Sequence, residues 1–142
     1  MVVYDLVRWT FVGLGWWGDF IPNIGGWLTG TGQPNWLLGY GFRWLGDGGG
    51  MGLTFMVAAR SFVPRLTRPA AFGVGIAYGL SIWLCLVVTL IISPEGQAML
   101  FPLTGVTLLL SWIGHVVYGM VLGAFLARSG MRTNRMPEYA AR

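Results

Sequence analysis

Two long apolar runs without a charged side chain constrain this chain more than any other feature. Residues 71–93 (AFGVGIAYGLSIWLCLVVTLIIS) and residues 104–127 contain no Asp, Glu, Lys or Arg. A helix needs about 20 mostly apolar residues to cross a hydrocarbon core of about 30 Å, and both runs are long enough. The composition agrees, since 55% of the residues are hydrophobic and only 10% are charged. The sequence therefore predicts an integral membrane protein.

Two further helices are expected in the N-terminal part, over residues 3–22 and 36–59, although both contain charged residues. The uncharged end of the second one, residues 48–59, would cover only about 18 Å as a helix. This helix can therefore cross a membrane only by taking its charges into the bilayer. We expect an all-α, integral membrane four-helix bundle, formed as a single domain over residues 1–142.

Arginine residues set the expected orientation of the bundle. They gather in the linker 60–70 and in the tail 128–142, whereas the connection between the last two helices carries only Glu95. Because basic residues favour the cytoplasmic side, both termini are expected in the cytoplasm (N-in/C-in) and the Gly- and Trp-rich loop 23–35 outside. This describes a multi-pass protein of a bacterial-type inner (plasma) membrane. The net charge of +4 suggests contact with anionic lipid and not with nucleic acid.

The single histidine, His115, lies at the centre of the run 104–127, and Asp47 lies at the centre of residues 36–59. The two side chains are therefore expected at the same depth. An ionisable residue at the bilayer centre costs about 2.5–3.5 kcal/mol and normally faces a partner inside the bundle. We expect a midplane hydrogen bond between Asp47 and His115, with Ser81 or Ser111 nearby. The pair is either a structural lock between two helices or a proton acceptor.

Arg43 precedes Asp47 by one helical turn. It can pair with Asp47 along the helix, or extend outward to meet Asp19 near the outer surface. We expect Asp19 and Arg43 to form an outer-side charge cluster that clamps the helices together.

Three consecutive glycines, Gly48, Gly49 and Gly50, directly follow Asp47. Each glycine is about 1 kcal/mol less favourable in a helix than alanine. The run predicts either a helix break at mid-membrane, of the kind that transporters use for ion and substrate sites, or a continuous helix whose glycines allow close packing.

Small residues recur at every fourth position of the last two helices, and in a bilayer such residues let helix backbones approach closely. The expected packing residues are Ala71, Gly75 and Gly79 in one helix and Gly119, Gly123 and Ala127 in the other.

Several short motifs together carry a family likeness. The chain combines a glycine-rich first helix with "WLLGYGF", the basic linker "RSFVPRLTRPA", "GIAYGL" and "GHVVYGMVLG". In this order these motifs resemble the YagU-like group of small bacterial inner-membrane proteins, and the H-x-x-Y-G-x-x-x-G pattern is the most telling part. The resemblance implies four membrane helices and no known biochemical activity. Arg43, Asp47 and the glycine run depart from the family pattern.

No catalytic motif is present in the sequence. It has no P-loop, no HExxH motif and no lysine, and its lone Cys85 excludes an intrachain disulfide. We therefore expect a non-enzymatic protein without a cofactor or a metal, in contact with the lipid bilayer.

Two function hypotheses follow. The first is a scaffold or accessory subunit that packs through its small-residue helix faces, as a homo-oligomer or within a larger membrane complex. The second is a small transporter, channel or proton-responsive element that uses the pair Asp47 and His115.

Overall fold

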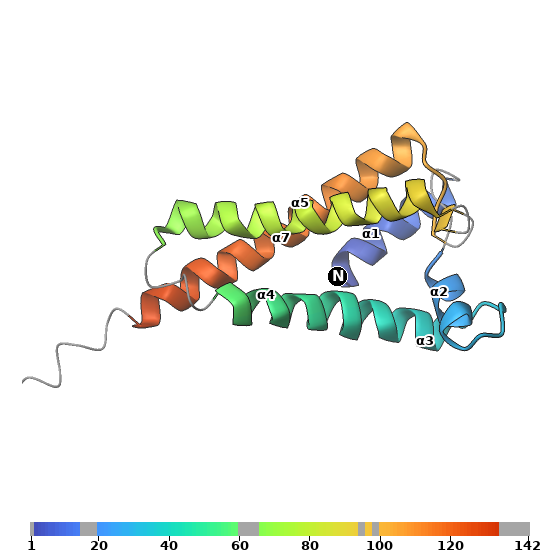
Figure 1. Ribbon diagram of the computed structural model, residues 1–142, viewed down its shortest axis with the longest axis horizontal. Helices are drawn as coiled ribbons and strands as arrows, with labels where there is room; N and C mark the ends of the chain where they lie inside the picture. The colour runs from blue at the N-terminus through green and yellow to red at the C-terminus, as the bar shows by residue number, and fades with distance from the viewer. Residues whose placement is uncertain (1, 15–19, 60–65, 94–95, 98–99, 134–142) are drawn as a thin grey trace, which may run out of the picture.

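The computed structural model describes residues 2–14, 20–59, 66–93, 96–97 and 100–133, and the regular secondary structure within these ranges is helical (Figure 1). The predicted all-α fold class is confirmed. Two of the helices, Arg68–Ile92 and Gly105–Ser129, are candidate membrane spans by length and composition. The finding supports a small membrane protein in contact with the lipid bilayer.

The two candidate spans belong to helices α5 (Arg68–Ile92) and α7 (Gly105–Thr133), which cross near their middles (Figure 1). Helix α5 begins three residues before the expected start at residue 71, because the side chain of Thr67 caps it by accepting a hydrogen bond from the Ala70 amide at 3.4 Å. Helix α7 continues to Thr133, so the first residues of the expected tail 128–142 are helical. Residues 60–65 and 134–142, which hold the rest of the expected linker and tail, lie outside the described residues.

Helices α5 and α7 approach each other through glycines. A Cβ atom built on Gly119 would lie 2.6 Å from the carbonyl oxygen of Gly75, and one built on Gly123 would lie 2.7 Å from that of Phe72. Neither position has room for a side chain. Beside these glycines, the buried residues Ala71, Leu122 and Leu126 form an apolar core with Phe55 and Ala59. The α5–α7 pair is therefore the most closely packed part of the fold.

One long helical stretch runs alongside this pair. It consists of α3 (Trp36–Gly41), the π-helix η1 (Phe42–Gly50) and α4 (Met51–Ala59), which follow one another without a gap and form one continuous ribbon in Figure 1. Its start coincides with that of the helix expected over residues 36–59, and the structure describes it as far as Ala59. Asn35 caps the start, since its side-chain oxygen accepts a hydrogen bond from the Leu38 amide at 3.0 Å.

The N-terminal part differs from the expected single helix 3–22. Helix α1 covers Val2–Gly13, and a separate helix, α2 (Ile21–Leu28), occupies the end of that range and the first half of the expected loop 23–35. Helix α2 folds back on α3, so closely that a Cβ atom on Gly39 would lie 3.2 Å from the Cα atom of Pro22. The turn between them uses Gly30 and Gly32 at φ values of 67° and 65°, which favour glycine. This compact hairpin replaces an open loop.

Candidate functional site

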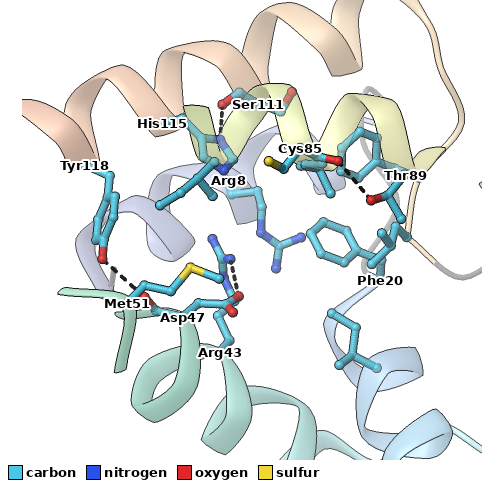
Figure 2. A pocket seen from close by; sticks show the side chains of 16 residues that line it. Arg8, Phe20, Arg43, Asp47, Met51, Cys85, Thr89, Ser111, His115 and Tyr118 are labelled. Carbon is cyan, nitrogen blue, oxygen red and sulfur yellow. Dashed lines mark hydrogen bonds and ion pairs between the residues drawn. The ribbon is translucent and has the colours of Figure 1, made fainter. Parts of the chain in front are cut away.

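A cavity of about 300 Å³ lies between the α5–α7 pair and the N-terminal helices. Its wall includes Arg8 of α1, Asp47 of η1, Cys85 of α5 and His115 of α7, so four elements that are far apart in the sequence contribute to it. Figure 2 shows these side chains pointing toward a common space. The expected midplane residues Asp47 and His115 therefore line the same cavity.

A buried carboxylate organises the charged side of this region. Asp5 of α1 is only 4% exposed, and its two oxygens accept hydrogen bonds from Arg43 Nε at 2.9 Å and from Trp44 Nε1 at 3.0 Å. Arg8 Nε lies 3.7 Å from the same carboxylate. Two arginines from different helices thus share Asp5, which itself is not part of the cavity wall.

Arg8 is the most deeply buried charged residue of the described chain, with 1% exposure. Its Nη2 donates to the Tyr40 hydroxyl at 3.1 Å, and that hydroxyl also accepts a hydrogen bond from Trp9 Nε1 at 2.7 Å. Its guanidinium carbon lies 5.4 Å from the centre of the Phe20 ring, within the range of a cation–π contact. Arg8 therefore connects the charged side of the cavity with its aromatic side.

Arg43 pairs with Asp5 and, more loosely, with Asp47, whose Oδ2 lies 3.7 Å from Arg43 Nη1. The expected pairing along the helix is therefore present. Among the described residues, the ion pair of Arg43 with Asp5 is shorter, at 2.9 Å, and it joins η1 to α1, a partner that the sequence did not predict. The other expected partner, Asp19, lies outside the described residues, so the expected outer cluster of Asp19 and Arg43 stays a prediction.

The expected hydrogen bond between Asp47 and His115 is not among the hydrogen bonds of the described residues. Instead, His115 Nδ1 lies 2.7 Å from the carbonyl oxygen of Ser111 in its own helix, and the Asp47 carboxylate faces Arg43. Because one ring nitrogen of His115 is hydrogen-bonded to a carbonyl of its own helix, the ring does not need a hydrogen-bond partner from η1. The cavity separates the two members of the expected pair, and each has a nearer partner.

Of the two serines expected near this pair, only Ser111 lines the cavity. It is 3% exposed, accepts a hydrogen bond from Trp83 Nε1 at 3.0 Å and donates to the Leu108 carbonyl at 3.0 Å. Ser81 is exposed and donates to the carbonyls of Ala77 and Tyr78 in its own helix. Ser81 therefore has no place in the site.

Of the two structures expected for the glycine run after Asp47, the continuous helix is the one observed. The chain stays helical through Gly48, Gly49 and Gly50, so there is no unwound break in this stretch. Gly49 and Gly50 do not pack closely, because they are exposed and a Cβ atom there would meet only carbonyl oxygens of the same helix at 3.6 and 3.5 Å, whereas the buried Gly52 lies against Tyr118 and Leu122. The glycines lie at the end of the π-helix instead, a widened winding that is frequent at functional sites.

Two tyrosines from the α5–α7 pair hold this π-helical stretch. Tyr118 of α7 donates to the Asp47 carbonyl at 3.3 Å, and Tyr78 of α5 donates to the Met51 carbonyl at 3.1 Å (Figure 2 shows the first of these bonds). Both hydroxyls therefore satisfy backbone oxygens at the junction of η1 and α4.

The remaining wall of the cavity is apolar and lies away from Tyr118 and Asp47, on the side where Figure 2 labels Phe20 and Thr89. Phe20 and Phe101 are buried here, with ring centres 5.5 Å apart. The other apolar residues of this side are Ile24, Leu86 and Leu100. The cavity thus has a charged end and an apolar end.

The expected packing residues lie where α5 and α7 meet. Ala71, Gly75 and Gly79 of α5 are buried, as are Gly119 and Gly123 of α7. Ala127 is partly buried against the same core. These faces pack against each other within one chain.

Sequence reasoning missed the roles of Asp5, Arg8 and Tyr118. A signal for the first two was present, since an acidic and a basic residue three positions apart in an apolar helix are expected to face inward together. Tyr118 is the tyrosine of the H-x-x-Y-G-x-x-x-G pattern, but the pattern did not indicate its contact with the Asp47 carbonyl. Among the residues that the structure describes, no three His, Cys, Asp or Glu side chains converge in a way that could hold a metal ion.

Comparison of the chain with family models, with curated proteins and with solved structures finds no match.

Proposed function

We propose that the chain is a small, non-enzymatic, four-span membrane protein that binds a small solute within the bilayer, as a transporter-type element. The observation that carries this proposal is the cavity of about 300 Å³, which has charged and apolar ends and is lined by residues of six helical elements, α1, α2, η1, α4, α5 and α7. Concave sites with mainly apolar walls and a few convergent polar groups are typical of small-molecule binding.

The exposure pattern of α1 supports its placement in a bilayer. Its charged residues Asp5 and Arg8 are buried, whereas its neighbouring apolar side chains Val3, Leu6 and Val7 are between 52% and 76% exposed. A helix at a water surface shows the opposite pattern. Buried charges that pair with one another, beneath an apolar exterior, are what the interior of a lipid bilayer demands.

The packing of the small-residue helix faces also supports the proposal. The scaffold hypothesis needed Gly75, Gly79, Gly119 and Gly123 to receive a partner helix, but in the structure they receive each other. A Cβ atom on Gly79 would lie 3.1 Å from Gly119 Cα. These faces have no surface left for a partner, whereas the cavity is open to a ligand.

The arrangement also offers a means of access to the cavity. One wall is the tightly packed α5–α7 pair, and the opposite wall includes η1, whose junction with α4 is tied to that pair by the hydroxyls of Tyr118 and Tyr78. Two neutral hydrogen bonds contribute only about 1 kcal/mol each. Loss of these two bonds would release the η1–α4 junction from the pair, while Phe55 and Ala59 of α4 stay packed in the apolar core with α5 and α7.

Cysteine labelling tests the four-span topology. In a Cys85→Ser background, Gln33→Cys lies in the α2–α3 turn and Ser129→Cys lies near the end of α7. With four spans and cytoplasmic termini, a membrane-impermeant maleimide labels Gln33→Cys in intact cells and Ser129→Cys only after lysis. A protein with α5 and α7 as its only spans would place both cysteines on the same side.

Native mass spectrometry tests whether the cavity is a binding site. The wild-type protein released from detergent is expected to carry a small molecule. Leu86→Trp, which fills the apolar end, should remove it, and Leu84→Trp is the matched control because Leu84 is 57% exposed on the same helix and does not line the cavity. An empty wild-type protein, or equal retention by both variants, would overturn the proposal.

A further inference from the structure

We propose that the ligand of this cavity is an uncharged hydrogen-bond donor, in its simplest form an alcohol with one short apolar tail. This inference rests on the proposed function, because it names the class of solute that the same cavity binds. The polar atoms that the wall offers to a ligand are mainly hydrogen-bond acceptors.

The hydroxyl groups of the described wall residues have already donated their hydrogens. Ser111, Thr89 and Tyr118 each donate to a backbone carbonyl, at 3.0, 2.9 and 3.3 Å respectively. A hydroxyl has one hydrogen and two lone pairs, so these groups have only acceptor capacity left. His115 is similar, because its Nδ1–H donates to the Ser111 carbonyl at 2.7 Å and Nε2 of the neutral ring keeps a lone pair. The thiol of Cys85 adds only a weak donor.

The carboxylate of Asp47 is the strongest acceptor of the wall. Its side chain is 29% exposed, whereas that of Arg43 is 13% exposed and that of Arg8 is fully buried. The ion pair of Asp47 with Arg43 is long, at 3.7 Å, while Arg43 Nε lies 2.9 Å from Asp5. A carboxylate has about four lone-pair sites, so one long contact leaves several of them for a ligand. A ligand can therefore bind Asp47 while both arginines keep their partners within the protein.

The charges around this carboxylate favour an uncharged head group. Asp47 itself would repel an anion, because it lies on the wall. It would attract an ammonium group, but Arg43 Nη1, only 3.7 Å from the same carboxylate, would repel that group. A neutral hydroxyl avoids both repulsions, and its hydrogen bond to a carboxylate is stronger than one to a neutral acceptor. The structure thus assigns the head as a hydroxyl group that donates to Asp47.

The apolar end of the cavity accommodates the tail. Phe20, Leu86 and Phe101 line this end. The volume of about 300 Å³ is at the small end of the range for ligand sites, which is about 300–1,000 Å³. Such a cavity fits a single short chain better than the two long chains of a phospholipid. We therefore choose eight-carbon probes.

The test is a binding competition with the purified protein at neutral pH, in a detergent without hydroxyl groups. Tritiated 1-octanol is bound by the wild-type protein in a scintillation proximity assay, and unlabelled 1-octanol, 1-methoxyheptane, octylammonium and octanoate compete. The ether 1-methoxyheptane is an isomer of octanol that has no hydrogen-bond donor. It should compete at least about tenfold less well than octanol, because hydrogen bonds to charged groups are among the strong ones. Both charged probes should also be weaker than octanol.

The variant Asp47→Asn tests which group accepts the hydroxyl. The amide keeps the size of the side chain but loses the charge, so the preference for octanol over 1-methoxyheptane should fall severalfold while the ether still binds. Ser81→Ala is the control, because it removes a hydroxyl that does not line the cavity, and it should keep the preference. An unchanged preference in Asp47→Asn would overturn the role of this carboxylate.

The pair Leu86→Trp and Leu84→Trp separates specific binding from detergent uptake. Leu86→Trp should lose octanol binding and Leu84→Trp should keep it, with both proteins monodisperse in gel filtration. Equal competition by the ether, or stronger competition by either charged probe, would overturn the uncharged donor. If such binding is lost only in Leu86→Trp, the binding function remains intact. Absence of saturable octanol binding overturns this inference, and native mass spectrometry decides separately whether the cavity binds another solute.

Discussion

The Nδ1 atom of His115 lies 2.7 Å from the carbonyl oxygen of Ser111, one turn earlier in α7. A carbonyl oxygen can only accept a hydrogen bond, so Nδ1 carries the proton. In the neutral ring, Nε2 is then an acceptor within the wall of the cavity. His115 thus has a defined tautomer without any contribution from Asp47.

This relationship predicts the ring state of His115. Because His115 is the single histidine of the chain, ¹⁵N-histidine labelling gives one pair of ring signals. At a pH where the ring is neutral, the Nδ1–H tautomer is expected, with the proton-bearing shift at Nδ1 and the unprotonated shift at Nε2. The reverse assignment would show that the Ser111 carbonyl does not fix the ring. Asp47→Asn should leave the tautomer unchanged, since the two side chains are not hydrogen-bonded.

Two glycines on one helix give a matched test of the α5–α7 packing. Gly75→Ala places a methyl group against the backbone of Gly119 and Gly123, whereas Gly73→Ala points it into open space. We expect Gly75→Ala to lower the free energy of unfolding by about 1–3 kcal/mol through overpacking. Gly73→Ala should be neutral or slightly stabilising, because alanine favours a helix more than glycine does. Unfolding in SDS, followed by circular dichroism, measures both. Equal effects of the two variants would contradict the close approach.

The buried carboxylate of Asp5 is expected to be among the most sensitive positions of the chain. Asp5→Asn keeps the shape but removes the negative charge that Arg8 and Arg43 share. The expected loss is about 3 kcal/mol or more, the usual result of breaking a buried ion pair. Trp44→Phe removes only one hydrogen bond to the same carboxylate and should have a smaller effect. Thermal unfolding in the same detergent compares the two, and a tolerated Asp5→Asn would mean that the charges are solvated.

The tyrosine contacts with the π-helical stretch predict a change in local dynamics. Removing the hydroxyl in Tyr118→Phe frees the Asp47 carbonyl, and Tyr78→Phe frees that of Met51. We expect faster hydrogen exchange of the amides around residues 46–52 in both variants. Tyr40→Phe, which loses hydrogen bonds to Arg8 and Trp9 instead, is the control and should not change exchange there. Exchange that is the same in all three variants would show that the hydroxyls do not restrain η1.

The sequence predicted the helical class well, because long apolar runs without charged residues are typical of helices that can cross a membrane. It also predicted the start of the stretch 36–59, which is capped by Asn35. It missed helix α2, since "IPNIGGWL" contains two glycines of low helix propensity. These glycines instead lie against backbone atoms of Gln33 and Asn35, so tertiary packing outweighs local preference.

The candidate site was predicted only in part, for a geometric reason. Counting along a run gives the depth of Asp47 and His115, and both do line one cavity. The depth of a residue does not tell on which side of its helix the side chain lies. It also does not tell which residue of another helix that side chain contacts. Arg43 forms an ion pair with Asp5 of α1. The spacing of residues 36–59 could not predict this pair, because Asp5 lies in another helix.

The π-helix η1 also changes the directions in which side chains point from the long helix. A helix closed by i→i+5 bonds winds more residues into each turn than an α-helix. Every residue after Gly50 is therefore displaced from the position it would take on a wheel drawn at 100° per residue. At the start of η1, Arg43 and Trp44 meet Asp5 of α1, and after its end Gly52 lies against Tyr118 and Leu122 of α7. One continuous helix thereby turns one edge toward the N-terminal half and a different edge toward the C-terminal half, with the glycines at the point where the phase changes.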